Sequence, residues 1–561
     1  MTMRKLPVLA AAALLSAGVV MTPQAHALAP YQVLVFSKTA GFRHDSIPAG
    51  IQAIRDLGSA NGFTVTATEN AATFTPTELA KYAAVVFLST TGDVLDGTQQ
   101  SAFESYVNAG GGYVGVHAAA DTEYDWPFYG QLVGAYFSSH PNIQQVNVKV
   151  EDRAHPATAH LGPVWTRTDE LYNYRANPRP NVKVLATLDE SSYSGGTMGA
   201  DHPISWCHAQ SSGRSFYTGL GHTIESYADS AFRTHLLGGI KYAAGAAKAD
   251  CRPETGYTGL FTGSTSGWSQ AGPGGFANAD GTLTSQGGPG NLWYSTKEFG
   301  SYSLKLDWRL TGDGDSGVFL GFPSSGAANP GAGGHEVAID ASGAANATTG
   351  AVYGFQAPDT AVRDAALNPP GQWNTFELLV EGERLRVYLN GRQVNDFTNT
   401  DAARSLRQGY VGLQNNGDGS TSFRNVRIKE LGGVTPTQVQ GEAYTSSFGV
   451  QPAGHSGAVG GQTVGYIENG DWAAYSQVST AGARQFTARV SSGGAGGRIE
   501  IRSGSSTGTL LGSVAVANTG SFDNFTTVTT ALTGSATGQV VLVFTGTGSG
   551  GLFDVDHFTL G

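Results

Sequence analysis

The hydrophobic pattern changes once along this chain, near residue 250, and this change limits the folds that its 561 residues can adopt. Before the change, β-rich runs such as YQVLVF (31–36) and GYVGV (112–116) alternate with helical stretches such as IPAGIQAIRDLG (47–58). Strand, helix and strand at this spacing predict an α/β domain with an open parallel sheet, from Tyr31 to about Gly245. After the change, the helical period disappears.

Between residues 256 and 431, strands are separated by turn signals. In the stretch TFELLVEGERLRVYLNGRQVNDF, we expect Gly-Glu (382–383) and Asn-Gly (390–391) each to close a hairpin. This pattern predicts an antiparallel β-sandwich. A further segment, 438–561, also consists of short strands and contains no lysine, so it predicts a second, separate β-sandwich.

The first residues predict export from the cell. Arg4 and Lys5 precede an apolar run (6–20), and Ala-His-Ala at 25–27 is a small-x-small cleavage pattern. The run is shorter than the roughly 20 apolar residues that a membrane span needs. We therefore expect residues 1–27 to be a removed signal peptide, and the mature protein to be secreted, extracellular and without a membrane anchor.

Together these patterns divide the chain into domains and linkers. The piece ADCRPETGYTGL has the polar, Pro- and Gly-containing sequence of a linker. The expected order is a signal peptide (1–27), an α/β domain (30–246), a linker (247–257), a β-sandwich (258–431), a linker (432–437) and a second sandwich (438–561).

Composition excludes several classes of protein and partner. Glycine makes up 79 of the 561 residues and charged residues only 14%, which is unlike coiled coils, charged disordered tails and ordinary helical cytosolic enzymes. Without Arg4 and Lys5 the mature chain has 31 basic residues against 44 acidic ones, a net charge of −13. This charge argues against nucleic acids and anionic membranes as partners.

Cys207 and Cys251 are the two cysteines of the chain. In an oxidising compartment, an even pair is typical of one structural disulfide. A nucleophilic role is less favoured, because neither residue lies on a strand-to-helix elbow that would activate a thiolate. The sequence has no CxxC motif, so we do not expect a zinc site made of cysteines.

Three stretches near the C-terminus, VQGEAYTSSFGV, VGYIENGDWAAYSQV and LFDVDHFTL, together resemble the family-six type of carbohydrate-binding module. Sugars present flat C–H faces that stack on aromatic rings, and hydroxyls that need polar partners. The family's stacking Tyr matches Tyr466, its opposing Trp falls at Phe522 and its polar Asn falls at Asp554. Core packing is the alternative for Tyr466 and the favoured interpretation for Trp472.

The same resemblance implies a structural calcium ion in this module. Its oxygen ligands carry over to Gln440, Glu442 and Asp556, which lie near both ends of the segment. A cation bound there would clamp a small sandwich.

The middle segment contains SGVFLGF, GGHEVAID, NPPGQWNTFEL and GYVGLQNNGDGSTSFRNVRIKEL, and it resembles the 3-keto-disaccharide hydrolase type of domain, a concanavalin-like jelly roll. In the oxidised sugars on which such domains act, a 3-keto group acidifies the neighbouring C–H. A general base can then open the glycosidic bond by elimination, and water adds afterwards. Glu336 matches the family's strand carboxylate, which implies a base or a metal ligand; the alternative is a solvated strand carboxylate. Ala338 replaces the family's usual Gln and Asn416 its usual His, so the domain is a weakened enzyme or a sugar binder.

In the first domain, FSKTAGFRHDSIPAG, GGGYVGVHAAADTEYDWPFYGQLVGAYFSSHP, RTDELYNY, GADHPISWCHAQ and SFYTGLGHT resemble the trehalose-utilisation (ThuA-like) family. That family shares the fold of class I glutamine amidotransferases, in which a nucleophile sits at the elbow after a strand. Here GYVGVHAA places His117 at the elbow, where we expect an exposed side chain. Histidine cannot form the thioester that amide hydrolysis uses, so glutaminase activity is not expected.

Polar residues that follow strands are the candidate catalytic groups of this domain: His44, His117, Asp121, His140, Glu170, His202 and His222. The carboxyl ends of strands in an open parallel sheet form the ligand crevice. We therefore expect His44, His117 and His222 to share a pocket, with Glu170 or His202 at its rim; alternatively, some histidines only bond backbone carbonyls. Imidazoles and Glu170 could hold a divalent metal or transfer protons on a keto sugar, and the sequence does not choose between these roles.

Two functions remain open. The favoured one is a secreted modular protein that hydrolyses or otherwise processes (3-keto-)glycosides while its C-terminal module holds it on polysaccharide. The alternative is a non-catalytic, multivalent carbohydrate-binding protein. Ala338 and Asn416 favour the alternative for the middle domain, whereas the histidines favour catalysis in the first.

Overall fold

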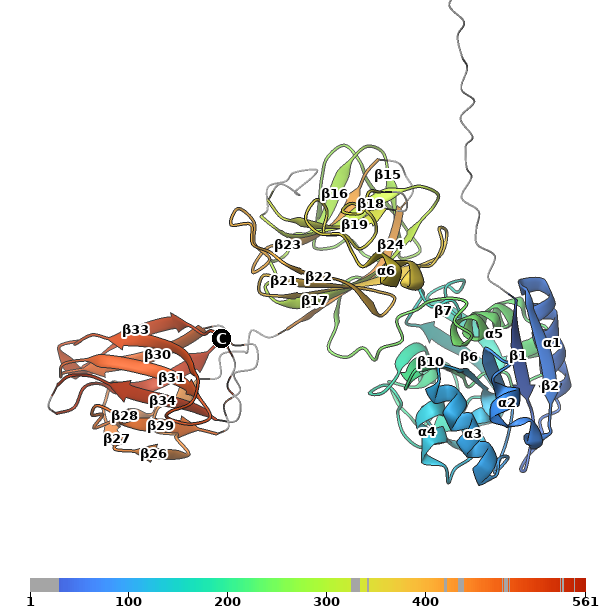
Figure 1. Cartoon of the computed structure of the whole chain (residues 1–561), viewed down its shortest axis with the longest axis horizontal. Helices are drawn as coiled ribbons and strands as arrows, with labels where there is room; N and C mark the ends of the chain where they lie inside the picture. Colours follow the sequence, from blue (N-terminus) through green and yellow to red (C-terminus); the bar gives the residue numbers. More distant parts are fainter. Residues whose placement is uncertain are drawn as a thin grey trace, which may run out of the picture.

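The described residues of the computed structural model form three domains along the chain (Figure 1). They are residues 30–561 apart from 324–332, 341–342, 418–420, 432–437, 477, 479–482, 484, 535, 537–538 and 549. The expected signal peptide (1–27) and second linker (432–437) lie outside the described residues. Within the described part, no helix is long and apolar enough to cross a membrane.

A mixed sheet forms the centre of the first domain, with the strand order β2-β1-β3-β4-β11-β10-β9-β6-β7. Its parallel part consists of β2 (Phe63–Thr68), β1 (Tyr31–Phe36), β3 (Ala84–Leu88), β4 (Gly112–Val116) and β11 (Gly213–Thr218). Its antiparallel part consists of β10 (Pro203–Gln210), β9 (Lys183–Leu188), β6 (Gln144–Val150) and β7 (Val164–Asp169). The expected parallel α/β sheet is thus confirmed for the strands from β2 to β11 in this order, and antiparallel strands extend the sheet beyond β11.

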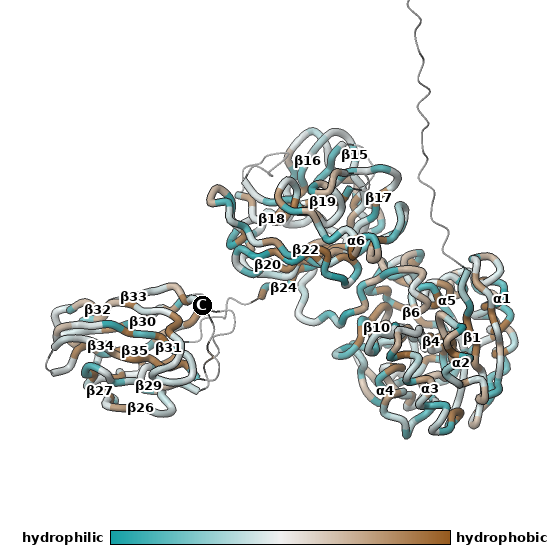
Figure 2. The backbone as a smooth tube through the Cα atoms, viewed as in Figure 1, coloured by the Kyte–Doolittle hydropathy of each residue, from teal (hydrophilic) through white to brown (hydrophobic). Residues whose placement is uncertain are grey.

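Helices cover this sheet, and hydrophobic segments follow its central strands (Figure 2). The helices are α1 (Ile47–Asn61), α2 (Pro76–Leu79), α3 (Gly97–Asn108), α4 (Pro127–Val133) and α5 (Ser230–Ala243). Every residue of β3 and β4 is buried, because helices lie on both faces of the parallel part. A capping box of Asp96 and Gln99 begins α3. A two-stranded sheet, β5 (Phe137–Ser139) with β8 (Asn173–Tyr174), joins two loops of the domain.

The middle domain is a β-sandwich, as expected. One sheet has the order β14 (Gly275–Ala279), β15 (Thr282–Gln286), β24 (Thr421–Glu430), β17 (Tyr302–Leu310), β20 (Asn374–Glu381), β21 (Arg384–Leu389) and β22 (Arg392–Thr398), with β12 (Thr258–Phe261) on β24. The other has β13 (Trp268–Ala271), β16 (Gly290–Tyr294), β23 (Tyr410–Asn415), β18 (Asp315–Phe322) and β19 (His335–Asp340), and α6 (Thr360–Ala366) precedes β20. Both expected hairpins are present, and Asn390 and Gly391 have the positive φ values of a tight hairpin turn.

The C-terminal domain is a second sandwich. One sheet contains β27 (Gln451–Gly454), β28 (Gln462–Gly465), β35 (Asp554–Leu560), β30 (Gln485–Ser492) and β33 (Ser521–Ala531), with β25 (Val439–Gln440) on β35. The other contains β26 (Ser446–Phe448), β29 (Trp472–Tyr475), β34 (Val540–Thr545), β31 (Gly497–Ser503) and β32 (Leu510–Val516). Trp472 packs against Val541 and Val543, in agreement with its expected packing role.

The first linker is held between the first two domains. A disulfide joins Cys251 to Cys207 of β10, as expected. Farther along, Glu254 forms ion pairs with Lys183 of the first domain at 2.7 Å and with Arg427 of the second at 2.7 Å. The segment 247–257 therefore connects the domains while its acidic side chains bind both of them.

Candidate functional site

Four side chains from loops that follow strands meet at one end of the first sheet. His44 lies between β1 and α1, and His117 directly follows β4. Glu170 directly follows β7, and His222 comes shortly after β11. Each residue offers one nitrogen or carboxylate oxygen, and these atoms all lie within 4.8 Å of one another. The structure thus brings the three expected histidines together with Glu170; we call this set the histidine cluster.

Close contacts connect the members of the histidine cluster. His117 Nε2 lies 3.0 Å from His222 Nδ1. Glu170 Oε2 lies 3.3 Å from the former atom and 3.1 Å from the latter. The ring of His44 packs edge-on against the other two imidazoles, and its buried Nδ1 has no hydrogen-bond partner among the described residues. Inward-facing polar atoms of this kind are typical of a ligand site.

His117 has a left-handed backbone, with a φ of 50°, at the turn after β4. Non-glycine residues adopt this conformation rarely, in tight turns or where the surrounding structure holds a strained residue, as it does at many active sites. The expectation of an exposed side chain is wrong, because His117 is fully buried. Its Nδ1 lies 3.0 Å from the carbonyl oxygen of Gly219, and the ring of Tyr172 covers it at a centroid distance of 4.2 Å. The loop after β7, which carries Tyr172, causes this burial.

The cluster shifts the pKa values of its members in different directions. Burial, together with His117 and His222, lowers the pKa of His44 to about 3. Burial opposes ionisation of Glu170, but the contacts of its carboxylate with His117 and His222 outweigh this effect and hold the pKa of Glu170 below its ordinary value. Burial likewise opposes protonation of His222, but the hydrogen bond with Glu170 outweighs it and raises the pKa of His222. At neutral pH the ionised carboxylate of Glu170 and the neutral imidazole of His44 therefore belong to the same cluster. This combination suits a bound cation.

Of the other expected residues, His140 contacts the cluster and Asp121 is bonded elsewhere. His140 reaches it from the more exposed side, with its Nδ1 2.9 Å from Glu170 Oε1. Asp121 is turned toward Tyr124, whose hydroxyl donates a hydrogen bond of 2.5 Å to its carboxylate. Phe42, which had not been expected here, is largely exposed and packs edge-on against His44. An exposed aromatic ring beside the cluster is available to a sugar face.

The expected place of His202 at the pocket rim is wrong. His202 is fully buried directly before the start of β10, and its Nδ1 lies 2.8 Å from Glu190 Oε1. Its Nε2 lies 2.8 Å from the carbonyl oxygen of Tyr172. Both ring nitrogens are therefore used, and His202 supports the loop whose Tyr172 covers His117.

Asp169, the last residue of β7, is a positioning residue that we did not expect. Its buried carboxylate accepts hydrogen bonds from the backbone N–H groups of Gly221, at 2.8 Å, and His222, at 3.0 Å. Arg167 donates to the same carboxylate at 2.8 Å. These bonds fix the loop that carries His222 beside Glu170. The alternation in VWTRTD, which puts Arg167 and Asp169 on one face, was the available signal.

In the middle domain, Glu336 lies on the face of β19 that points away from the core, opposite Phe319 of β18. Glu336 is buried, and Gln414 Nε2 donates to it at 3.3 Å. Burial, with the negative charge of Asp315, raises the pKa of Glu336 to about 7. It is therefore not the solvated strand carboxylate of the alternative, and it can exchange a proton near neutral pH.

Unpartnered polar atoms share this face with Glu336. The strand register places Asn291, Trp293 and Gln414 on it. Asn291 Oδ1, Trp293 Nε1 and Gln414 Oε1 are buried, and none has a hydrogen-bond partner within the described part of the chain. Because buried polar atoms are nearly always paired, these three indicate a second ligand site.

The two departures from the resembled family lie beside Glu336. Ala338 is buried two residues farther along β19. The side-chain amide of Asn416 donates to Asp315 at 2.6 Å. Neither residue titrates near neutral pH, so the proton chemistry on this face depends on Glu336.

In the C-terminal domain, Tyr466 follows β28 and is 63% exposed. Its ring is free to stack on a sugar, and the core-packing alternative is wrong. Phe522 and Asp554 lie near each other, because Ser491 pairs with Asp554 and donates to the Phe522 carbonyl at 2.7 Å. Asp554 is not an open polar contact as expected: it is buried, and its carboxylate pairs with His455 at 2.9 Å.

The three expected calcium ligands include unsatisfied oxygens. Gln440 Oε1 and Glu442 Oε2 are buried without a hydrogen-bond partner in the described residues. Asp556 is fully buried, accepts a hydrogen bond from the Val459 N–H at 3.0 Å and pairs with Arg489. Burial, with the negative charge of Asp556, raises the pKa of Glu442. Carboxylate and amide oxygens left in this state fit a hard cation such as Ca²⁺.

Comparison with known families finds one matching family model for each domain. Residues 32–243 match the family described as trehalose utilisation (ThuA), and residues 256–429 match the 3-keto-alpha-glucoside-1,2-lyase-like domain. Residues 440–561 match the carbohydrate binding module of family 6. These matches confirm the three resemblances and their order.

Individual relatives match parts of the chain. Arabinoxylan arabinofuranohydrolase of Bacillus subtilis is 33% identical over 169 residues, which are 28% of this chain and 33% of that protein. A family 6 carbohydrate-binding module from Clostridium cellulolyticum, solved in complex with xylose, is 37% identical, with 22% of this chain and 97% of that chain covered and a TM-score of 0.21. A putative ThuA-like protein from Bacteroides uniformis is 24% identical, with 40% of this chain and 95% of that chain covered and a TM-score of 0.36. The chain spans about a third or less of the length of the curated relatives that it matches.

Proposed function

We propose that this chain, which combines a trehalose-utilisation domain, a 3-keto-alpha-glucoside-1,2-lyase-like domain and a family 6 carbohydrate-binding module, is a secreted enzyme that cleaves (3-keto-)glycosides while bound to polysaccharide. The histidine cluster is its main reaction centre. The observation that carries this proposal is the convergence of three imidazoles and one carboxylate within 4.8 Å, at the end of a sheet where α/β proteins bind ligands.

The histidine cluster fits a divalent transition metal such as Zn²⁺, which imidazole and carboxylate ligands favour. His117 Nδ1 faces the carbonyl oxygen of Gly219, which can only accept, so Nδ1 donates and Nε2 presents its lone pair to the centre of the cluster. His44, Glu170 and His222 complete the ligand set. When bound, such an ion polarises a carbonyl oxygen or lowers the pKa of a water molecule.

The residues around the cluster have separate roles in the proposed reaction. Asp169 holds the loop of His222, and Tyr172 covers His117 and excludes water from that side. His140, which contacts Glu170 from the exposed side, can transfer a proton to or from a sugar. Phe42 offers its ring to the sugar face beside the cluster.

Glu336 gives the middle domain its own proposed step on 3-keto sugars. With a pKa near 7, its carboxylate can take the proton from the carbon next to a 3-keto group, and the carboxylic acid can later return a proton. Binding without catalysis is the second candidate for this domain, and Ala338 and Asn416 favour it.

The test is to incubate the full chain with 3-keto-trehalose, 3-keto-glucosides and their unoxidised parents, with and without added Zn²⁺ or Mn²⁺. Chromatography should detect cleavage products from at least one keto-glycoside. Loss of products in Glu170→Gln but not in Glu336→Gln would assign the reaction to the first domain. If no substrate is cleaved under any condition, the non-catalytic binding function takes the place of this proposal.

For polysaccharide binding, we expect Tyr466→Ala to weaken the affinity of the full chain for its polysaccharide by about tenfold or more, because a stacking surface is lost. The melting temperature should not change, because the ring is mostly exposed. Affinity electrophoresis in xylan and in β-glucan measures the effect. Phe448→Ala, which removes another exposed aromatic ring of the same module, is the matched control. Equal retention of wild type and Tyr466→Ala would refute the role of Tyr466.

For the proposed calcium site, we expect removal of Ca²⁺ to lower the melting temperature of the C-terminal domain by about 4 °C or more, because unpaired buried oxygens repel one another without the ion. Calorimetry of the full chain before and after chelation measures this shift, and added Ca²⁺ should reverse it. Glu442→Gln should remove the dependence on Ca²⁺. A melting temperature that is the same with and without Ca²⁺ would exclude the ion from this domain.

A further inference from the structure

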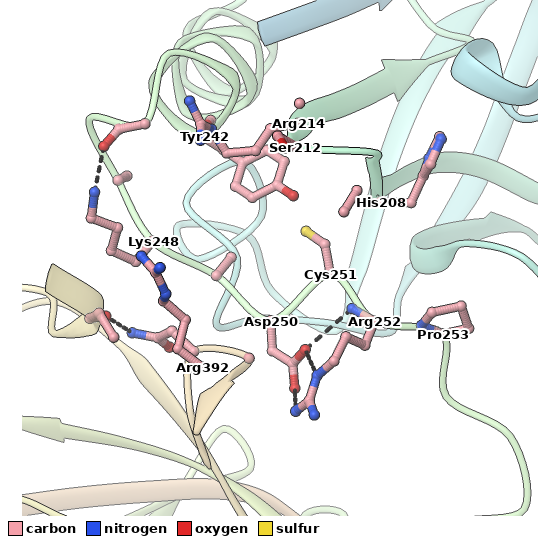
Figure 3. Close-up of a pocket in the computed structure, with 18 of the residues that line it drawn as sticks. His208, Ser212, Arg214, Tyr242, Lys248, Asp250, Cys251, Arg252, Pro253 and Arg392 are labelled. Atoms are coloured by element: carbon pink, nitrogen blue, oxygen red, sulfur yellow. Dashed lines mark hydrogen bonds and ion pairs between the residues drawn. The ribbon is translucent and has the colours of Figure 1, made fainter. Parts of the chain in front are cut away.

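A cavity of about 540 Å³ lies where the first domain, the linker and the middle domain meet (Figure 3). Its walls include Arg214 near the start of β11, Lys248 and Arg252 of the linker, and Arg392 at the start of β22. The histidine cluster is elsewhere, since His222 follows the other end of β11, which at about 3.3 Å per residue is some 20 Å long. Cavities of this volume accommodate small organic ligands.

The cations of this cavity outnumber its anions. Asp250 is the carboxylate in its lining, and it is already engaged by Arg252, at 2.7 Å, and by Lys305, at 2.9 Å. Across the described residues, no carboxylate lies within ion-pair distance of Arg214, Lys248 or Arg392. A chain with a formal charge of −11 thus concentrates three uncompensated positive charges at one domain junction.

Lys248 is held in place by hydrogen bonds, and the positive charges of Arg214 and Arg392 act on it. Asn368 of the middle domain bonds both the N–H and the carbonyl of Lys248, at 3.0 and 2.9 Å. The ammonium group donates to the Gly245 carbonyl at 2.6 Å, which leaves further N–H donors for a ligand. Burial, with the positive charges of Arg214 and Arg392, lowers the pKa of Lys248. A bound anion would relieve this repulsion.

The disulfide adds rigidity to the cavity. Cys251 lies in the cavity wall, three residues after Lys248, and is bonded to Cys207 of the first sheet. Arg214 is held by the carbonyl oxygens of Tyr242 and Ala243 at the end of α5. The cationic groups are thus mounted on fixed backbone, which lowers the entropic cost of binding.

We infer that this cavity binds a small molecule carrying an oxyanion group, namely an acidic saccharide such as a uronic acid, through Lys248, Arg392 and Arg214. Guanidinium and ammonium donors match a carboxylate, and Ser212, Asn181 and the other polar groups of the wall suit hydroxyls. The oxyanion part stands on the geometry alone, whereas the saccharide part rests on the proposed function. Binding would link the first and middle domains, because each supplies a cation.

The test is isothermal titration calorimetry of the full chain with glucuronate, inorganic sulfate, inorganic phosphate and glucose, at constant ionic strength set with NaCl. We expect saturable binding of glucuronate and none of glucose. Lys248→Gln and Arg392→Gln should each weaken glucuronate binding by about tenfold. Lys297→Gln, which removes an exposed cation elsewhere on the middle domain, should not weaken it.

Each outcome decides one part of the inference. Sulfate or phosphate that binds as tightly as glucuronate, with the same loss in the variants, would keep the oxyanion site and overturn the saccharide. Binding that is absent for all anions, or unchanged in both variants, would overturn the site. The titration repeated in Glu170→Gln separates this inference from the proposed function, because binding here should persist when cleavage is lost.

Discussion

Glu170→Gln should reduce kcat/KM for the cleaved keto-glycoside by at least about 100-fold, while the protein keeps its fold. Glutamine preserves the volume of the side chain but removes the charge that faces His117 and His222. Glu170 is a proposed ligand of the ion and also contacts His140, the proposed proton donor or acceptor. Its loss should therefore weaken binding of the ion and disturb a proton transfer that contributes about 10²- to 10⁴-fold to the rate. Activity assays and metal analysis of the purified variant measure both effects.

Glu78→Gln, an identical substitution in an exposed ion pair with Lys81, is the control and should leave activity unchanged. Glu170→Gln is a cleaner test than His117→Ala. A histidine exposed at an elbow could be truncated without a large loss of stability, but the structure buries His117 completely, so alanine would leave a cavity. Full activity in Glu170→Gln would remove the histidine cluster from the reaction.

Glu254→Gln should destabilise the unit formed by the first two domains by about 3–5 kcal/mol, the usual loss when one partner of a buried ion pair is removed. Glu254 pairs with Lys183, Lys305 and Arg427, whose side chains are all buried. Each cation keeps one other carboxylate, at 3.5, 2.9 and 3.6 Å for Asp152, Asp250 and Asp307, but a glutamine cannot replace the charge that all three share. Urea unfolding of the full chain measures the change in free energy.

The same interaction predicts a dependence on pH. Burial opposes ionisation of Glu254, but Arg427 and Lys183 outweigh it and hold its pKa well below the ordinary value of 4.5. Its contribution to stability is therefore present above pH 4.5 and declines as the pH falls toward the folded-state pKa. In Glu254→Gln, the free energy of unfolding should decrease less than in the wild type as the pH falls below 4.5. Glu430→Gln, in an exposed pair with Lys297, should cost about 1 kcal/mol or less, and an equal cost in both variants would contradict the prediction.

Strand-end residues show how far the sequence predicts a site. His44, His117 and His222 follow parallel strands, and the rule that such strands end at one edge of the sheet was enough to bring them together. Glu170 follows β7, which is separated from β11 by three antiparallel strands. No local pattern states that the loop after β7 returns to that edge, so the sequence offered Glu170 and His202 as alternatives at the rim, and only the fold chose Glu170.

Burial was the property that the sequence predicted least well. His202 directly precedes β10, and both its nitrogens are used inside the protein, by Glu190 and by the carbonyl of Tyr172. Asp554 is likewise buried against His455 instead of facing a sugar. In each case the partner comes from another part of the chain. Its position depends on how the loops pack, which hydrophobic periodicity does not predict.

By itself, the sequence determined the order of the three domains, the fold class of each and the position of the strands, because these depend on hydrophobic periodicity and turn residues that act within a few residues of one another. Only the tertiary structure decided that Glu170, and not His202, joins the three histidines, that His117 is covered by Tyr172, and that a linker expected to be a polar connection is held between two domains by Glu254. These features join residues that are distant in the chain, and their free energies come from contacts and desolvation that exist only once the chain has folded.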